Sequence, residues 1–376
     1  MVITKWTGGL MRRLAIATAH DVISRHTLEL SLFTGGVDGH VLSLDYDESC
    51  DHLRVRWLYA DGTRRTDTIP RPVNCLTCAT RIAMEDELIA ADDDELPILA
   101  VAPGGIELTS LVPHLIDDIE DSRHPLAGVV VSHTLTCVDS TVASALLLGT
   151  GHAIHNWVRS CRLSSPGDDN WVDESDSTIG DVLLGDLLYA DTIAVIGEAG
   201  VGRDLIEHAC DETTDLVTSV EDFDFRTILR GVHDLDSALE RAHPATMRAC
   251  GGSTAHGVHT IDLYSNRPVH PDRLIEHLGE VIPNHAFVRG CFWVPTRPDS
   301  VCTWSGTNGS VSIGEAGYWD GDAHTRLIIT GDHLAEAQSE IEAAFRDLLV
   351  PETQWKNGLW QWLGKTDELE PWLGER

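Results

Sequence analysis

The sequence predicts an α/β fold in which a larger domain with a mostly parallel sheet is followed by a smaller α+β domain. Four short apolar runs in the first part of the chain alternate with helix-like segments and end in loops that carry glycine or aspartate. This order is typical of a doubly wound parallel sheet. The last third instead holds closely spaced strand-like runs, which favour an antiparallel sheet. At 376 residues the chain exceeds one typical core, so two domains are expected.

The elements of the first domain follow from apolar runs and their alternation. Its parallel strands are predicted at residues 14–19, 96–101, 128–138 and 192–196. Two further strands, at residues 37–46 and 52–59, alternate polar and apolar residues and precede an Asp-Gly turn. Helices are predicted at residues 22–30 and 82–89, and solvated surface segments at residues 91–95 and 164–177. Residues 1–10 are expected to form a loose tail, with Met11 as an alternative start.

A change of composition at residues 250–253 predicts a linker, so we expect one domain over residues 11–250 and another over residues 256–376. The second domain is predicted to contain strands at residues 258–264, 287–294, 300–305, 310–313 and 325–329, and helices at residues 271–282 and 334–349. The tail then carries Trp355, Trp360, Trp362 and Trp372. Such a cluster favours a clamp packed onto the domain over a partner-docking site.

The formal net charge of −33 is the strongest compositional signal, with 60 acidic residues against 27 basic ones. Such a surface repels phosphate, which disfavours a direct grip on nucleic acid, and a large partner should present a basic face. A solubility or salt adaptation of the host explains the charge equally well. The apolar runs are too short to span a bilayer and no secretory signal is evident, so a soluble cytoplasmic protein is expected. Nine scattered cysteines do not suggest a disulfide framework.

Cys75 and Cys78 stand three residues apart in a turn that we expect to lead into a helix. A helix N-terminus lowers the pKa of a thiol, which favours metal ligation or redox exchange over inert burial. The spacing is half of a zinc site, so a tetrahedral ion would need further donors from His20, His40, His52 or a partner. Two half-buried cysteines without a role, or a redox disulfide, remain alternatives.

The loop after the first predicted strand is where a nucleotide-binding α/β fold holds phosphate. Residues 18–25 contain neither the glycines nor the lysine of such a Walker A loop. No catalytic triad, paired-carboxylate site or dinucleotide fingerprint stands out elsewhere. His270 is expected to be a local hydrogen-bonding group rather than a ligand, and Cys291 and Cys302 are expected in the core.

Three motifs in the last third resemble the C-terminal domain of CobW-type proteins. They are residues 266–274, 288–299 and 316–319. Residues 74–81 are similar to the metal-binding turn of that family, in which three cysteines follow a Cys-x-Cys-Cys pattern. Here Thr77 stands where the second cysteine would be, which leaves Cys75 and Cys78.

The CobW resemblance implies a GTPase that inserts or delivers metals, with a P-loop, a magnesium-binding glutamate and an Asn-Lys-x-Asp guanine motif. In this chain the three positions are taken by residues 18–21, by Ala102 and Pro103, and by residues 197–200, and none carries its signature. Phosphoryl transfer depends on positioning and charge stabilisation by such groups. We therefore expect no GTP site and assign no catalytic or cofactor-binding residue.

The combination of a Cys-x-x-Cys turn, a degenerate P-loop and a CobW-type C-terminal domain resembles an actinobacterial branch of the family, which recruits a hibernation factor to ribosomes during zinc limitation. Residues 14–18 and 135–139 are similar to that branch. The resemblance implies an adaptor whose partners are the hibernation factor and the ribosome, with possible weak zinc sensing at Cys75 and Cys78. The acidic surface favours a basic protein partner over ribosomal RNA. The alternative is a CobW-type, GTP-dependent zinc metallochaperone. A zinc-storage module is a third hypothesis, for which two cysteines are too few.

Overall fold

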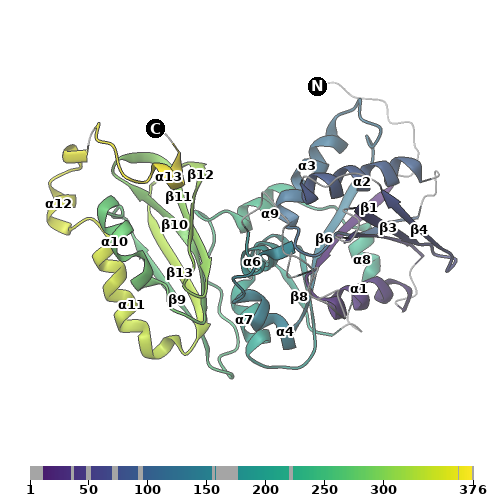
Figure 1. The fold of residues 1–376 in the computed structure, drawn as a ribbon, viewed down its shortest axis with the longest axis horizontal. Helices are drawn as coiled ribbons and strands as arrows, with labels where there is room; N and C mark the ends of the chain where they lie inside the picture. Colours follow the sequence, from purple (N-terminus) through teal and green to yellow (C-terminus); the bar gives the residue numbers. More distant parts are fainter. Residues whose placement is uncertain are drawn as a thin grey trace.

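The computed structural model forms two lobes, each built on its own β-sheet (Figure 1). It describes residues 12–34, 38–47, 52–69, 75–91, 96–154, 157, 177–219, 223–362 and 364–374. The predicted tail at residues 1–10, and the predicted surface segments except for Ala91 and Ser177, lie outside the described residues. No helix in the described ranges is long and apolar enough to cross a bilayer.

The first lobe holds an eight-stranded sheet in the order β4-β3-β2-β5-β1-β6-β7-β8. Its strands are β1 (Arg13–Ala19), β2 (His40–Asp47), β3 (His52–Leu58), β4 (Arg64–Ile69), β5 (Ile98–Val101), β6 (Val130–Asp139), β7 (Thr192–Ile196) and β8 (Asp215–Val217). The six strands from β2 to β8 in this order are parallel, and β3 and β4 add an antiparallel edge. The carboxyl ends of β1, β5, β6 and β7 therefore meet at one edge of the sheet.

Alternation along β1 explains how helices cover both faces of this sheet. Leu14 and Ile16 point into the larger core, while Ala15 and Ala17 point into a smaller one on the opposite face. The smaller core is closed by α1 (Val22–Thr34) and α8 (Phe225–Arg230). The larger core is closed by α2 (Leu76–Ala90), α3 (Leu108–Glu120), α4 (Ser140–Leu147), α6 (Ile179–Tyr189), α7 (Val201–Ala209) and α9 (Leu235–Ala242). The predicted mostly parallel α/β sheet is confirmed.

The second lobe holds a five-stranded antiparallel sheet in the order β12-β11-β10-β13-β9. Its elements are β9 (Val258–Ser265), α10 (Pro271–Val281), β10 (Ala286–Val294), β11 (Arg297–Thr307), β12 (Ser312–Tyr318), β13 (Thr325–Asp332) and α11 (Leu334–Leu348). Helices α10 and α11 pack together on one face, and α6 and α7 of the first lobe contact the other (Figure 1). Short turns of helix follow in the tail: α12 (Glu352–Lys356), η2 (Trp360–Trp362) and α13 (Glu370–Leu373). The predicted α+β architecture is confirmed.

Several predicted boundaries differ from the structure for identifiable reasons. The helix predicted at residues 82–89 begins at Leu76, because Cys75 already serves as its N-cap. The strand predicted at residues 310–313 begins at Ser312 and continues to Tyr318. The strand β4 was not predicted, since its side chains are exposed or only half buried and lack an apolar alternation.

Candidate functional site

The two predicted metal-binding thiols lie at the start of α2, at the carboxyl edge of the first sheet. Cys75 is the N-cap in an extended conformation, and its Sγ accepts a hydrogen bond from the backbone N–H of Cys78 at 3.4 Å. Both side chains are exposed, whereas the other cysteines in the described ranges are buried. The predicted position of both thiols at a helix start is therefore confirmed, and they are accessible to a metal ion or a reagent. The predicted turn at residues 70–74 lies outside the described residues.

The expectation that the helix N-terminus lowers the thiol pKa is wrong for Cys78. A hydrogen bond to Cys75 raises the pKa of Cys78 most, and partial burial and the charge of Cys75 raise it further. The reason is that both thiols lie at the same helix start. Once one of them is a thiolate, loss of the proton from the other would place two negative charges side by side. A metal ion that binds both sulfur atoms has to displace this second proton.

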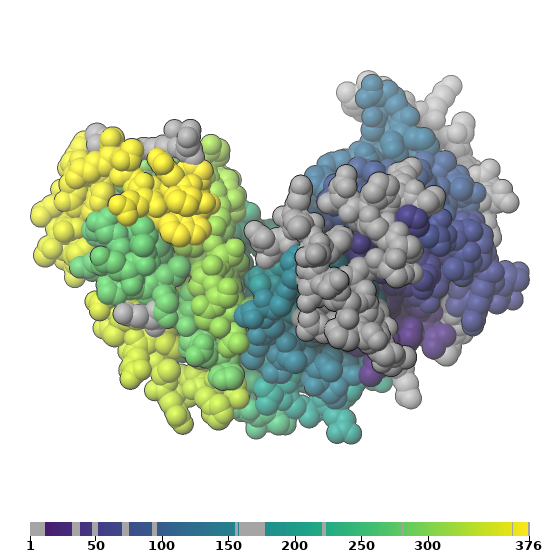
Figure 2. Space-filling model, in the orientation of Figure 1, coloured from purple at the N-terminus to yellow at the C-terminus, as the bar shows by residue number. Residues whose placement is uncertain are grey.

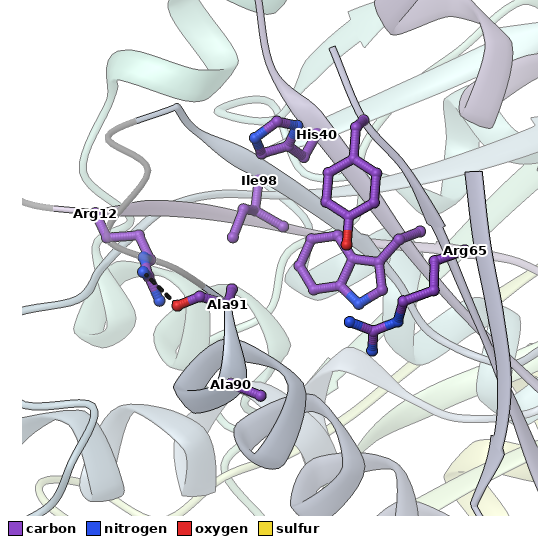
Figure 3. A pocket seen from close by; sticks show the side chains of 8 residues that line it. Arg12, His40, Arg65, Ala90, Ala91 and Ile98 are labelled. Atoms are coloured by element: carbon purple, nitrogen blue, oxygen red, sulfur yellow. Dashed lines mark hydrogen bonds between the residues drawn. The ribbon is translucent and has the colours of Figure 1, made fainter. Parts of the chain in front are cut away.

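His40 cannot complete a zinc site with these thiols. It lines a cavity of about 350 Å³ together with Ala90 and Ala91 of the last turn of α2 (Figure 3). The thiols stand at the first turn, and a helix of 15 residues spans about 22 Å. His40 also accepts a hydrogen bond from the backbone N–H of Ala60 through Nδ1, at 3.1 Å. The predicted contribution of His40 is therefore wrong.

The remaining predicted donors do not complete the site either. His20 is buried and bonded to an aspartate in the loop after β1, and His52 begins β3. Nowhere in the described ranges do three histidine, cysteine, aspartate or glutamate side chains come together as a metal site. Cys75 and Cys78 fit zinc as two of four tetrahedral ligands, so further ligands would have to come from solvent or a partner.

The loop after β1 is fixed by Asp186, a fully buried carboxylate of α6. Asp186 accepts hydrogen bonds from Thr18 Oγ1 at 2.5 Å, from His20 Nε2 at 2.9 Å and from the backbone N–H of Leu108 at 2.7 Å. His20 Nδ1 accepts from the backbone N–H of Gly105 at 3.2 Å, so the proton of the ring lies on Nε2. This carboxylate thus joins β1, the start of α3 and the loop after β5.

A second carboxylate occupies the start of α1. Asp21 accepts hydrogen bonds from the backbone N–H and the hydroxyl of Ser24, at 2.8 and 2.5 Å, and from the backbone N–H of Asp139 at 3.4 Å. Free N–H groups at such a position are what a phosphate-binding loop offers to its ligand. Here the chain's own carboxylates accept one backbone N–H near the start of each helix, from Ser24 of α1 and from Leu108 of α3.

Trp157 and Arg25 cover the loop after β5. The Trp157 ring lies so close to Gly104 that an added Cβ would be 2.2 Å from the ring, and Arg25 stands 5.4 Å from the ring centre. Arg25 is buried and donates to the backbone carbonyls of Ala102 and Leu44 at 2.6 and 2.7 Å. This contact was not predicted, because the partners of Arg25 are distant along the chain.

The loop after β7 is also held by internal contacts. Gly197 turns with φ of +88°, a value that favours glycine, and the Ser140 hydroxyl donates to the carbonyl of Glu198 at 2.7 Å. Asp139 caps α4 by accepting from the backbone N–H of Thr141 at 2.8 Å. The loops after β1, β5 and β7, where the three nucleotide signatures are missing, thus meet at one edge of the sheet and are held by contacts within the protein.

Glu107, just before α3, was missed by sequence analysis. Burial raises the pKa of Glu107 to about 7, and the negative charge of Asp186 adds to the shift. The Thr109 hydroxyl donates to it at 2.9 Å. An acidic residue at a helix start is normally interpreted as a cap. The raised pKa of Glu107 could not be predicted, because it depends on packing against α6.

The other residues singled out in the sequence have structural positions in the second lobe. Cys291 and Cys302 are fully buried, as predicted, and burial raises the pKa of both to about 12. His270 packs edge-on against Trp362 as the N-cap of α10, and its backbone N–H donates to the carbonyl of Leu348 at 2.9 Å. Its Nδ1 makes no hydrogen bond in the part of the chain that the structure describes and lies 3.9 Å from Asp272. Trp355 also packs on the lobe, against Trp293. The other two tryptophans of the tail, Trp360 and Trp372, are exposed.

Comparison with known proteins agrees with the resemblance seen in the last third of the sequence. Residues 258–349 match the cobalamin synthesis protein cobW C-terminal domain. Among solved structures, the chain is similar to the Zn(II)-bound YjiA GTPase from E. coli and to a Zn(II)-bound triple mutant of YjiA GTPase. In both cases the identity is 13%, the TM-score is 0.35, and the match covers 90% of this chain and 99% of the other. No curated protein matches the sequence.

Proposed function

We propose that this protein is a CobW-like adaptor that recruits a hibernation factor to ribosomes during zinc limitation and does not depend on GTP hydrolysis. The cobW C-terminal domain at residues 258–349 supports a CobW-like, metal-related role. The observation that carries the adaptor hypothesis is the pair of carboxylates, Asp21 and Asp186, at the starts of α1 and α3.

These carboxylates oppose a triphosphate in two ways. Each already accepts a backbone N–H near a helix start, where a phosphate would otherwise bind, and their negative charges would repel it. Trp157 and Arg25 would also have to leave the loop after β5. Because catalysis of phosphoryl transfer is mainly positioning and electrostatic stabilisation, a site of this kind favours an output through contact with partners.

Cys75 and Cys78 would give the adaptor its response to zinc. A site with two protein ligands binds the ion weakly, so its occupancy follows the supply of zinc. Gain or loss of the ion at the start of α2 would change the turn that precedes the helix, which is a local switch. The net charge of −33 supports a basic protein as the partner that responds to it.

Nucleotide and zinc binding test the proposal with purified protein. We expect no saturable GTP binding with magnesium, and zinc binding that is lost in the double variant Cys75→Ala, Cys78→Ala. Micromolar, magnesium-dependent GTP binding would instead support the metallochaperone alternative. Equal zinc binding by the wild type and the double variant would exclude these thiols as the sensor.

Ribosome association tests the cellular role. Extracts of host cells grown with and without a zinc chelator are separated on sucrose gradients, and the protein is followed in the ribosome fractions. We expect the wild type to enter these fractions mainly after chelation, and the Cys75→Ala, Cys78→Ala variant to lose this dependence. The same distribution of the wild type in both media would refute the proposal.

A further inference from the structure

The inner face of the second sheet, which faces the first lobe, is divided into two halves. On one half Val258, Phe287 and Ile328 belong to the hydrophobic core of the first lobe. On the other half the residues are small: β11 sends Trp304 into its own core but turns Thr303 and Ser305 the other way. The first half is therefore packed against the first lobe, while the small side chains of the second half leave a space between the sheet and the first lobe.

A cleft of about 470 Å³ lies in front of the small half. Thr303 pairs with Gly314 and Ser305 pairs with Ser312, so these four residues lie on one face of the sheet. The opposite wall comes from the first lobe and consists mainly of α6. Figure 2 shows the surface hollowed between the two lobes.

The cleft carries two carboxylates, Glu107 and Asp181, and in the described ranges neither forms an ion pair. Glu315 borders the cleft but pairs with Cys302, so its side chain lies on the other face of β12. The contacts of Glu107 and Asp181 are hydroxyl and backbone groups of their own turns. Arg289 also lines the cleft, but it is buried and donates its guanidinium to the backbone carbonyl of Ala209 at 2.6 Å.

We propose that this cleft docks an extended, lysine- or arginine-bearing segment of a basic protein partner. The inference rests on the proposed adaptor function and names the surface that such a partner would use. Cationic side chains would neutralise carboxylates that have only hydroxyl and backbone contacts in the described ranges, and the small polar face leaves room for an extended backbone. Gly185 of α6 lies beside Glu107, since a Cβ added there would be 3.8 Å from that carboxyl group, in ordinary van der Waals contact.

Binding of a short fluorescein-labelled peptide of alternating lysine and threonine tests the cleft directly. We expect polarisation to report saturable binding that is about tenfold weaker for the double variant Glu107→Gln, Asp181→Asn. Ser312→Trp, which fills the cleft without changing charge, should weaken binding as much. The charge-matched control Glu336→Gln, Glu340→Gln alters exposed residues of α11 and should bind like the wild type.

Two outcomes would overturn the cleft proposal. One is that the control weakens binding as much as the cleft variant, which would indicate general attraction to an acidic surface. The other is that Ser312→Trp binds like the wild type. Neither touches the zinc-dependent ribosome association, which is measured separately, and a failure of that association with normal peptide binding would refute the cellular role but leave the cleft.

Proton release gives an independent readout of contact with Glu107. A cation beside this carboxyl group would lower its pKa from about 7, so binding near neutral pH should release a proton. Calorimetry of peptide binding in buffers of different ionisation enthalpy measures this release. We expect it in the wild type and its loss in Glu107→Gln, and an equal release in both would place the peptide elsewhere.

Discussion

Replacing Asp186 with asparagine should destabilise the first lobe by about 2 kcal/mol. Three donors point at this buried carboxylate, from Thr18, His20 and the backbone of Leu108. An asparagine side chain of the same shape has only one oxygen, so its NH₂ group must face at least one of these donors. An unsatisfied buried donor costs about 1–3 kcal/mol, and the other two bonds lose the strengthening given by a charge. Relief from burying the charge offsets part of this loss.

Urea unfolding monitored by circular dichroism measures this change. For a lobe of this size about 2 kcal/mol corresponds to a fall in melting temperature of roughly 4–8 °C. Asp117→Asn is the matched control, because the Asp117 side chain is exposed on α3 and its replacement should change stability by less than about 0.5 kcal/mol. If Asp186→Asn were no more destabilising than Asp117→Asn, the network around His20 would not be what fixes the loop after β1.

Three further changes test titratable groups, the first of them Asp191, which lies 2.7 Å from Nδ1 of His233. Burial raises the pKa of Asp191, but the hydrogen bond and charge of His233 outweigh burial and hold the pKa at about 2. The ionised Asp191 should therefore stabilise the fold fully above its unfolded pKa of about 4, and this stabilisation should be lost as the pH falls toward 2. Asp191→Asn should flatten the dependence of unfolding on pH in that window. Burial raises the pKa of Glu107 to about 7, so the stability of the wild type should fall as pH rises from about 4.5 to 7, and Glu107→Gln should remove that slope in urea titrations. Cys75→Ala removes the hydrogen bond that most raises the pKa of Cys78, so iodoacetamide should modify Cys78 faster at mildly alkaline pH; an unchanged rate would mean that Cys75 does not control it.

The two sheets could be predicted because their strands carry periodic apolar patterns. The run from Leu14 to Ala19 is apolar almost throughout, as a strand covered on both faces must be. The strand β4 and the three-residue β8 escaped prediction because one is a polar edge and the other is very short. Helix α6 gave no amphipathic signal because it is buried on nearly every side, between the first sheet and the second lobe.

The site was predicted only where its residues are neighbours in sequence. Cys75 and Cys78 form a local motif, and their place at a helix start followed from the turn residues before them. His20 was correctly placed after a parallel strand, but its partner Asp186 lies 166 residues further along the chain, where no spacing rule reaches. The prediction that His40 is a zinc ligand was wrong because His40 lies at the other end of α2 from Cys75. The direction of α2 is set by tertiary packing, which the sequence motif does not specify.

The carboxylates at the carboxyl edge of the first sheet also explain how this fold can close without a bound anion. Helices that begin at such an edge leave N–H groups and a positive dipole end to be satisfied. In this chain α1, α3 and α4 each receive an aspartate of the protein itself, namely Asp21, Asp186 and Asp139. These carboxylates thus supply the stabilisation that the phosphates of a nucleotide could supply. A phosphate would have to displace them before it could bind the N–H groups of the helices. A sheet completed in this way can hold the thiols of α2 and the second lobe in fixed positions, which is what an adaptor requires.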